Sequence, residues 1–318
     1  MTENKKILIT GSCGVLANSF MRRANFEKSG YTFASMDRIN GDPNSAYSNK
    51  DHSFHIADIL DRHIVNVVFD IEKPDIVIHG AALTNTDASL INPSSFINNN
   101  ILGTQVIIDA CLKHKVKKLV YLSADSVYGQ LNSENETTWT EESPTNPTNP
   151  YSISKLSGEL LVKAANTHGL IYNIVRSCNN YGPRQTTDKF IPKVIKCVRD
   201  NQSIPVYGQG RQMRDWLHIF DCSSALLTIL KSGKDNQIYN VAAGQEYTNL
   251  EVVQIICNAM KKGHNSINFV ADRVGHDFRY ALNCNKIKEL GWQPTIKFKD
   301  GIEDLVNWYE INKYGLNF

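Results

Sequence analysis

The sequence lacks the features that mark membrane, secreted and nucleic-acid-binding proteins. No apolar run approaches the roughly 20 residues that a membrane-spanning helix needs, and Met1–Lys6 lead into the first strand without the apolar run or cleavage site of a signal peptide. The formal net charge is only +2 over 318 residues, and the basic residues form no stripe. We therefore expect a cytoplasmic protein with no membrane or nucleic-acid partner.

Paired cysteines are also missing. The seven cysteines are odd in number and none belongs to a C-x-x-C pair, which argues against a disulfide framework and against a zinc site. We expect most of them to be buried thiols in a reducing compartment, without a nucleophilic role. No metal is expected.

The first half of the chain alternates short apolar runs with longer mixed segments. The helix candidates lie near 16–29, 93–115 and Tyr151–His168, and the strand candidates are Lys5–Thr10, Tyr31–Asp37, Phe54–Ala57, Asp75–Ala81, Lys117–Ala124 and Tyr172–Ser177. Strands that alternate with helices indicate βαβ units. The pattern predicts an α/β fold with a Rossmann-type, doubly wound parallel sheet covered by helices on both faces.

The pattern becomes irregular after the strand candidate that ends at Ser177. One short strand is expected at Ile204–Tyr207, with helices near 188–200, 221–232, 249–262 and 300–313. We predict a dinucleotide-binding domain over residues 1–175. A smaller, partly interleaved α/β substrate domain is expected over residues 176–318.

A glycine-rich turn, Thr10–Ala17, follows the first strand. Gly11 allows the tight turn, and Gly14 lets the backbone approach a pyrophosphate at the N-terminus of the next helix. Ala17 stands where a third glycine is usual, a tolerated change where helix and strand pack closely. The turn predicts a dinucleotide site.

Acidic residues follow the next two strand candidates. Asp37 ends the second strand, where a carboxylate accepts hydrogen bonds from an adenosine ribose. The neighbouring Arg38 leaves NADP open, but the acid favours NAD. Asp58 is read equally as a cofactor contact and as a helix N-cap.

Tyr151 and Lys155 open a helix and lie on one face of it, since residues i and i+4 are neighbours on a helix surface. A nearby ammonium stabilises phenolate, so we expect a lowered pKa for Tyr151 and a role as a base towards a hydroxyl. Lys155 can also hold a ribose. A Y-x-x-x-K pair is common by chance, but here it follows a glycine-rich turn and an S-x-x-x-x-Y-G segment, Ser123–Gly129.

These motifs resemble the extended short-chain dehydrogenase/reductase family, and most of all its nucleotide-sugar dehydratase branch, the dTDP-glucose 4,6-dehydratases. The resemblance runs over nearly the whole chain, and its last three segments are the most specific. The segments are Thr10–Ala17, His79–Ala82, Asn100–Thr104, Ser123–Gly129, Tyr151–Lys155, Cys178–Pro183, Lys189–Pro192, Arg214–His218 and Asp272–Tyr280.

The resemblance implies a reaction with internal oxidation and reduction. Tyr151 takes the proton from the sugar 4-hydroxyl while hydride passes to NAD. The 4-ketone acidifies carbon 5, water is eliminated across carbons 5 and 6, and the hydride returns to carbon 6. The helices near 93–115 and 150–168 resemble the pair that forms a four-helix homodimer bundle in this family.

Together the motifs and the resemblance predict two sets of binding residues. The cofactor set is Gly11, Cys13, Gly14, Val15, Asp37, Arg38, Asp58, Ile59, Ala81, Ala82, Thr84, Asn100, Ser123, Tyr151 and Lys155. The nucleotide-sugar set is Asp87, Asn179, Lys189, Pro205, Tyr207, Arg214, Asn240, Arg273 and His276. Guanidinium groups suit pyrophosphate oxygens, whereas a histidine in this set is read equally as a structural residue.

The chain departs from the resembled pattern where the elimination occurs. The family has Thr-Asp-Glu where this chain has Ala124-Asp125-Ser126, so the hydroxyl that bonds the 4-oxygen and the base for carbon 5 are both replaced. Asp125 remains as the general acid, and Ser126 or Ser123 is a candidate for the lost hydroxyl. The segment 83–88 lacks a family Glu and Arg. A missing general base costs roughly a hundred- to ten-thousand-fold in rate.

Three functions stay open. The first is a 4,6-dehydratase whose base is drawn from elsewhere, with Asp125 and Asp87 as candidates. The second is a nucleotide-sugar 4-epimerase, which needs the tyrosine, the lysine and NAD but no elimination base. The third is a weakly active paralogue that binds a nucleotide sugar.

Overall fold

The protein is described from a computed structural model. It covers residues 5–38, 52–263, 267–273 and 275–312. Met1–Asn4, Val274 of the last resemblance segment and residue 313 of the last expected helix therefore lie outside the described residues.

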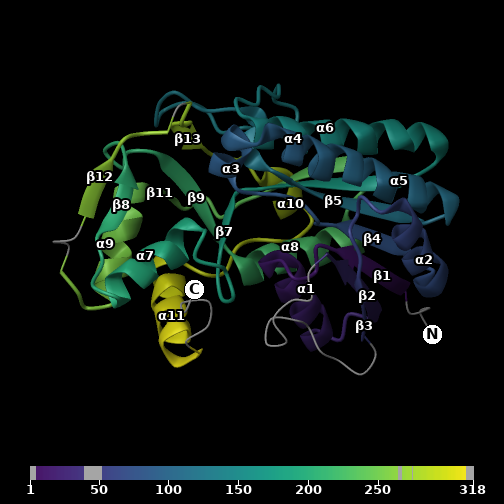
Figure 1. The fold of residues 1–318 in the computed structure, drawn as a ribbon, viewed down its shortest axis with the longest axis horizontal. Helices are drawn as coiled ribbons and strands as arrows, with labels where there is room; N and C mark the ends of the chain where they lie inside the picture. Colours follow the sequence, from purple (N-terminus) through teal and green to yellow (C-terminus); the bar gives the residue numbers. More distant parts are fainter. Residues whose placement is uncertain (1–4, 39–51, 264–266, 274, 313–318) are drawn as a thin grey trace.

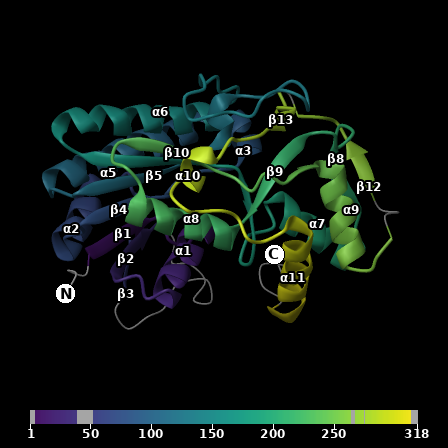
Figure 2. The ribbon, with the colours of Figure 1, turned by 180° about the vertical axis from the view of Figure 1, so that it is seen from behind.

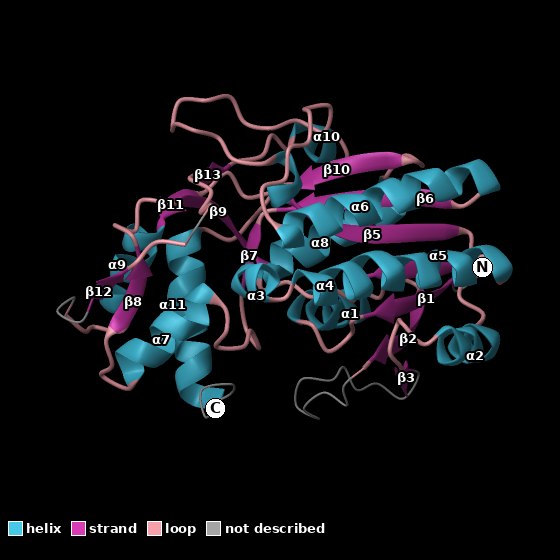
Figure 3. Cartoon of the chain, turned by 45° about the horizontal axis from the view of Figure 1, so that its top comes forward, coloured by secondary structure: helices cyan, strands magenta, loops and turns pink. Residues whose placement is uncertain are grey.

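A parallel sheet of seven strands dominates the N-terminal part, as the alternating pattern predicts. Its order is β10-β6-β5-β4-β1-β2-β3, and the strands run side by side in Figure 3. The chain order reverses between β1 and β4, which is the switch point of a doubly wound fold. The strands are β1 (Lys5–Thr10), β2 (Tyr31–Asp37), β3 (His52–Ile56), β4 (Ile76–His79), β5 (Lys118–Ala124), β6 (Ile171–Ser177) and β10 (Gln237–Val241).

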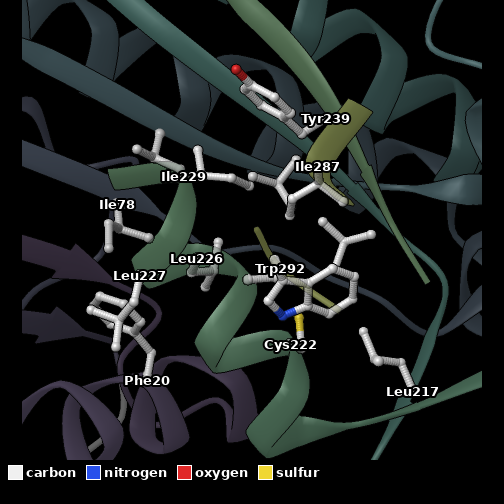
Figure 4. Close-up of a cluster of buried hydrophobic side chains, with 14 of the residues drawn as sticks. Phe20, Ile78, Leu217, Cys222, Leu226, Leu227, Ile229, Tyr239, Ile287 and Trp292 are labelled. Carbon is white, nitrogen blue, oxygen red and sulfur yellow. The ribbon is translucent and has the colours of Figure 1, made fainter. Parts of the chain in front are cut away.

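Alternation along these strands decides which core each side chain enters. Ile7 and Ile9 pack with α1 (Val15–Phe26) and α8 (Ile219–Ser232), whereas Leu8 packs on the other face. That face is covered by α2 (Arg62–Glu72), α5 (Gly103–Lys113) and α6 (Pro150–Ala165). Figure 1 shows α5 and α6 above the sheet and α1 and α8 below it. Figure 4 shows the core on the α1 and α8 side of the sheet, with Phe20, Leu226 and Trp292 among the packed side chains.

The C-terminal part has its own apolar core. Three helices, α7 (Phe190–Arg199), α9 (Asn249–Ala259) and α11 (Phe298–Asn312), enclose it, on the side of the molecule opposite α2 in Figure 2. A small sheet centres on β9 (Met213–His218), which pairs with β7 (Asn179–Tyr181), β11 (Glu246–Thr248) and β13 (Arg279–Tyr280). A second pair joins β8 (Ile204–Tyr207) to β12 (Ile267–Val270).

Two elements of the C-terminal half join the large sheet. β10 pairs with β6, and α8 packs against α1. The division into residues 1–175 and 176–318 stays a prediction. The expected helix over 93–115 is three segments, α4 (Pro93–Phe96), a π-helical stretch η1 (Ile97–Leu102) and α5.

Shorter elements complete the chain: α3 (Thr86–Ile91), the 3₁₀ turns η2 (Asp125–Tyr128) and η3 (Asn166–His168), and α10 (Asn285–Lys288). Six of the seven cysteines are buried, as expected, and Cys13 is half-buried. Among the described residues, no helix combines the length and the apolar character that crossing a membrane requires.

Candidate active site

A cleft of about 780 Å³ lies at the carboxyl ends of the parallel strands, between the large sheet and the C-terminal part. Open α/β sheets bind ligands at this edge, beside the switch point. All the predicted site residues line the cleft except Asn100 and Asn240. The fold therefore gathers one set of side chains from segments that are far apart in the sequence.

The turn after β1 closes tightly against the loop after β4. Gly11 has φ +72°, and a Cβ there would lie 2.6 Å from the backbone of Ala81. A Cβ at Gly14 would lie 3.0 Å from the carbonyl oxygen of Gly11. Ala17 is buried in the core beneath the turn. Glycine is required where the chain is left-handed and two backbones meet.

This turn fits a dinucleotide. The cap residue Gly14 provides no side chain to the first N–H groups of α1, and the first turn of α1 has no acidic residue. The helix N-terminus therefore offers donors and a positive dipole end to a pyrophosphate. The Asp37 carboxylate accepts from the backbone N–H of Cys13 at 2.9 Å, which orients it at the edge of the cleft.

Asp58 does not cap the next helix. Asp61 caps α2, accepting from the N–H groups of His63 and Ile64. Asp58 accepts from the N–H of Leu60 at 2.9 Å and lines the cleft. The N-cap interpretation of Asp58 is therefore wrong, and its cofactor role stays a prediction.

Tyr151 and Lys155 lie on the first two turns of α6. Asn149 caps this helix by accepting from the N–H of Ser152, and Pro150 occupies the first turn, where its missing N–H costs nothing. The Lys155 ammonium lies 4.3 Å from the centre of the Tyr121 ring. Both side chains reach the cleft.

The expected lowering of the Tyr151 pKa is wrong for the protein by itself. Burial raises the pKa of Tyr151, and the nearby charge of Asp125 raises it further. Burial also lowers the pKa of Lys155 to about 7, against the opposing effect of Glu159. The i, i+4 spacing predicts that the lysine lies near the tyrosine, but it does not show that both are buried. Burial disfavours the phenolate of Tyr151 and the ammonium of Lys155 alike.

A buried ion pair, which the sequence analysis missed, lies one turn beyond Lys155. Glu159 receives three hydrogen bonds from Arg176, the shortest at 2.7 Å, and a fourth from Ser123 at 2.5 Å. The guanidinium lies 4.5 Å from the centre of the Tyr128 ring. Glu159 continues the i, i+4 series of the catalytic pair, so the helical period was the signal that could have found it. The hydroxyl of Ser123 is engaged here.

Asp125 and Ser126 begin η2, directly after β5. Each is only 6% exposed, and both line the cleft. Asp125 Oδ2 and Ser126 Oγ have no hydrogen-bond partner. Burial raises the pKa of Asp125 to about 7, although the charge of Arg214 opposes the shift. This carboxyl therefore exchanges protons near neutral pH.

Cationic side chains line the C-terminal side of the cleft. Arg214 donates to three backbone carbonyls, those of Met213, Asp277 and Phe278, and burial lowers its pKa. A guanidinium held by carbonyls keeps its full charge for a ligand. His276 pairs with Asp272 at 2.7 Å, and burial lowers the pKa of His276.

Contacts cross the cleft from the loop after β4 and from the first turn of α3. Asp87 pairs with Arg273 at 2.5 Å and accepts a hydrogen bond from Tyr207 at 3.3 Å. Lys189 donates to Thr84 at 3.0 Å. Arg273, Tyr207 and Lys189, all predicted to bind the nucleotide sugar, are therefore bonded to residues on the opposite side of the cleft.

Asn240 and Asn100 do not reach the cleft. Asn240 is buried and donates to the carbonyls of Trp139 and Asn283, so its predicted contact with substrate is wrong. Asn100 donates to Leu83 O, which anchors the loop after β4 from behind. Asn100 therefore supports the loop after β4 and does not make the cofactor contact that the sequence predicts.

A second missed network lies beneath the same loop. The buried His79 imidazole is bonded by the hydroxyl of Thr10 at 2.6 Å and by that of Thr104 at 3.0 Å. The backbone N–H of Ala81 in turn donates to Thr10. Burial lowers the pKa of His79 to about 3, so this histidine is a neutral structural link between β1, β4 and α5.

Comparison with known proteins agrees with this geometry. A family model described as the NAD dependent epimerase/dehydratase family matches residues 7–242. A dTDP-glucose 4,6-dehydratase of Streptomyces niveus is 36% identical over 97% of this chain and 94% of its own length.

Solved structures are similar over nearly the whole chain. A dTDP-glucose 4,6-dehydratase of Streptomyces venezuelae, crystallised with NAD, gives a TM-score of 0.91 at 32% identity and covers 97% of this chain and 98% of its own. A UDP-glucose 4-epimerase of Thermus thermophilus, in complex with NAD, gives 0.89 at 26% identity, with 96% and 99% covered.

Proposed function

Since this chain belongs to the NAD-dependent epimerase/dehydratase family, we propose that it is an NAD-dependent nucleotide-sugar 4,6-dehydratase. The observation that carries the choice is Asp125, a buried cleft carboxyl with an unpartnered oxygen. A 4-epimerase only oxidises and reduces carbon 4, so it has no use for a carboxyl that moves protons at carbons 5 and 6. A dehydratase needs one.

The fit of the turn at Gly11–Ala17 to a pyrophosphate supports NAD as the cofactor. When bound, NAD supplies the hydride acceptor for carbon 4 and the hydride donor for carbon 6. The chain's own residues orient both ligands and move the protons. Asp37 is the residue proposed to bind the adenosine ribose, as its place at the end of β2 supports.

Tyr151 and Lys155 are proposed to act as one proton-sharing pair. A neutral phenol beside a neutral amine holds the same single proton as phenolate beside ammonium, so either form accepts one proton from the sugar 4-hydroxyl. Because the pKa of Lys155 lies at about 7, the pair is ready to accept a proton above that pH. We expect oxidation at carbon 4 to rise with pH through about 7.

Arg214, Arg273 and Lys189 are proposed to bind the nucleoside diphosphate. Bidentate donors and a point charge together suit the two phosphate groups. His276 is expected to support this site through its bond to Asp272. Asn179, Pro205 and Tyr207 complete the proposed substrate wall.

The test is incubation of the purified protein and NAD with dTDP-, UDP-, GDP- and CDP-glucose, followed by mass spectrometry and NMR. A 4-keto-6-deoxy sugar, lighter than its substrate by one water, supports the proposal. An inverted sugar with no loss of water identifies an epimerase instead. Tight binding without turnover identifies a binding paralogue.

A matched pair of variants tests the role of the phenol. Tyr151→Phe is expected to lower turnover by a hundred- to ten-thousand-fold, roughly the contribution of a positioned base. Tyr172→Phe removes a hydroxyl from β6 outside the cleft and is expected to leave turnover unchanged. Equal turnover of the two variants would count against the proposed chemistry.

We also propose a cytoplasmic homodimer. Apolar side chains are exposed on the neighbouring elements α3, η1 and α6, at Leu90, Ile91, Ile97, Leu102, Ile153 and Leu160. Exposed apolar patches of this kind mark protein contacts, and the predominantly buried free thiols suit a reducing compartment.

The dimer is tested by sedimentation of variants. Leu160→Lys places a charge on the proposed interface and is expected to give monomers. Ile71→Lys, an exposed apolar residue on α2 outside the patch, is expected to leave the assembly intact. A monomeric parent protein at micromolar concentration would end the dimer proposal.

A further inference from the structure

The Asp125–Ser126 step holds two unsatisfied polar atoms side by side in the chain. The carboxylate oxygen Oδ2 of Asp125 and the hydroxyl oxygen of Ser126 are buried, and neither has a partner. Buried polar atoms are nearly always hydrogen-bonded, because an unmade bond costs free energy. Both residues line the cleft, so a ligand bound there is a suitable hydrogen-bond partner for each atom.

The other carboxyls on this side of the cleft are already engaged. Asp87 pairs with Arg273 and accepts from Tyr207. Asp277 accepts hydrogen bonds from Thr148 and Tyr280. Among the described residues, Asp125 is therefore the carboxyl with a buried, unpartnered oxygen.

Asp188 is occupied in the same way. It accepts from the hydroxyl of Thr186 and forms an ion pair with Lys189 at 3.1 Å. Its side chain is also 44% exposed, so water is available to satisfy the rest of it. Asp188 therefore has no buried oxygen that lacks a hydrogen-bond partner.

Asp125 interacts electrostatically with both the proposed base Tyr151 and the proposed diphosphate contact Arg214. Its charge raises the pKa of Tyr151, and the charge of Arg214 acts on Asp125 in turn. Tyr151 is the proposed base at carbon 4, and Arg214 is a proposed diphosphate contact. A sugar that reaches from Tyr151 to Arg214 would therefore lie near Asp125.

We propose that Asp125 alone carries both proton transfers of the elimination, taking the proton from carbon 5 and giving it to the leaving 6-oxygen, an assignment that rests on the proposed dehydratase function. The Ser126 hydroxyl holds the departing oxygen. Asp125 thus does the work of the two carboxyls that the resembled pattern has at 125 and 126.

The step balances with one carboxyl. The carboxylate forms an O–H bond as the carbon 5–hydrogen bond breaks, and that electron pair becomes the enolate of the 4-ketone. The enolate pair then forms the carbon 5–carbon 6 double bond as the carbon 6–oxygen bond breaks. The leaving oxygen takes the proton from Asp125 and departs as water, so the carboxylate is regenerated and the sugar loses one water.

Adjacency makes one group sufficient. The hydrogen on carbon 5 and the oxygen on carbon 6 are on neighbouring carbons, with a spacing comparable to that of the two oxygens of one carboxylate. Both transfers then occur on the same face of the sugar. A carboxyl whose pKa is about 7 is matched to both removing and returning a proton near neutral pH.

The experiment follows carbon 5 in deuterium oxide. Asp125→Asn is nearly isosteric and leaves oxidation at carbon 4 to Tyr151, so the variant should still produce reduced nicotinamide absorbance with substrate. Its loss of water should fall by a hundred- to ten-thousand-fold. Exchange of solvent deuterium into carbon 5 of recovered substrate, read by NMR, should fall to the level without enzyme.

Exchange at carbon 5 is the outcome that decides the proposal. If a different group were the base, Asp125→Asn would still exchange carbon 5 while failing to expel water, and the assignment would be overturned. Asp109→Asn, an exposed carboxylate outside the cleft, should match the parent in every readout. A parent protein that transfers hydride but releases no dehydrated sugar would refute the dehydratase itself.

Two further variants separate chemistry from folding. Adding Ser126→Glu to Asp125→Asn should restore carbon 5 exchange without restoring rapid loss of water, which an unfolded variant could not do. Ser126→Ala alone should slow elimination by about two- to ten-fold, as expected for one neutral hydrogen bond. Failure of the double variant to regain exchange, with reduced nicotinamide still forming, would contradict a base at this step.

Discussion

Replacing Asp125 with asparagine is expected to make the folded protein more stable at neutral and alkaline pH. Burial raises the pKa of this carboxyl from its ordinary 3.8 to about 7. Between those values the folded chain holds a proton that the unfolded chain has released. The free energy of unfolding of the parent therefore falls as pH rises through this window and levels off above it.

The size of the effect follows from the shift. About three pH units at 1.36 kcal/mol per unit correspond to about 4 kcal/mol once the pH is above 7. At pH 5 less than half of that penalty has developed. The advantage of Asp125→Asn over the parent should consequently grow by roughly 2–3 kcal/mol between pH 5 and pH 8.

Urea unfolding of both proteins without ligands, followed by far-ultraviolet circular dichroism at pH 5, 6, 7 and 8, measures this difference. Asp109→Asn, which removes a carboxylate that is 41% exposed, provides the control for the substitution itself. An Asp125→Asn difference that does not change with pH would refute the reasoning, since it would mean that the carboxyl is not held in a dry site.

Other perturbations have equally definite outcomes. Glu159→Gln leaves the guanidinium of Arg176 buried without its counter-ion, so the free energy of unfolding should fall by about 3–5 kcal/mol in urea titrations. Gly11→Ala should abolish NAD binding in fluorescence titrations, because its Cβ would meet backbone at 2.6 Å, whereas Gly30→Ala, at φ +79° with nothing within 4 Å, should lose about 1–2 kcal/mol of stability and still bind NAD. Asp87→Asn removes the carboxylate that competes for the cleft guanidinium, so calorimetry should show nucleoside diphosphates binding about two- to five-fold more tightly.

Local patterns predicted six of the seven strands of the large sheet, because most of these strands are short apolar runs with a turn at their end, but they did not predict β10. Lys5–Thr10 and Tyr31–Asp37 have the bounds that the sequence predicts. The helix α2 was missed, since its core is rich in valine and isoleucine, which are weak helix formers. Its signal was the capping carboxylate of Asp61.

The C-terminal sheet could not be found from local pattern. β13 has two residues and β7 has three, and each exists only because it pairs with β9. Such strands are created by partners distant in the sequence, which no single window contains. The predicted substrate contact of Asn240 is wrong for a related reason. Asn240 belongs to β10, which pairs with β6 in the large sheet, and this pairing buries the side chain against the loop at Trp139.

The site residues were predicted by type and spacing, but their charge states were not. The Tyr151–Lys155 spacing indicates proximity, whereas burial reverses the expected direction of the phenol's pKa shift. Burial depends on the whole fold, so a motif alone does not show it. Glu159 shows the converse, since the same helical period continued for one more turn would have found it.

The segment 81–87 joins the two ends of the cleft. At Ala81 it lies against the glycine turn, and at Asp87 it is tied to Arg273 across the opening. A diphosphate that binds Arg273 would break its ion pair with Asp87 and so free that end of segment 81–87. The other end of the segment, at Ala81, packs against the glycine-rich turn that is proposed to bind the dinucleotide. We therefore expect the affinity for one ligand to depend on the presence of the other, and by thermodynamic reciprocity the factor is the same in both directions.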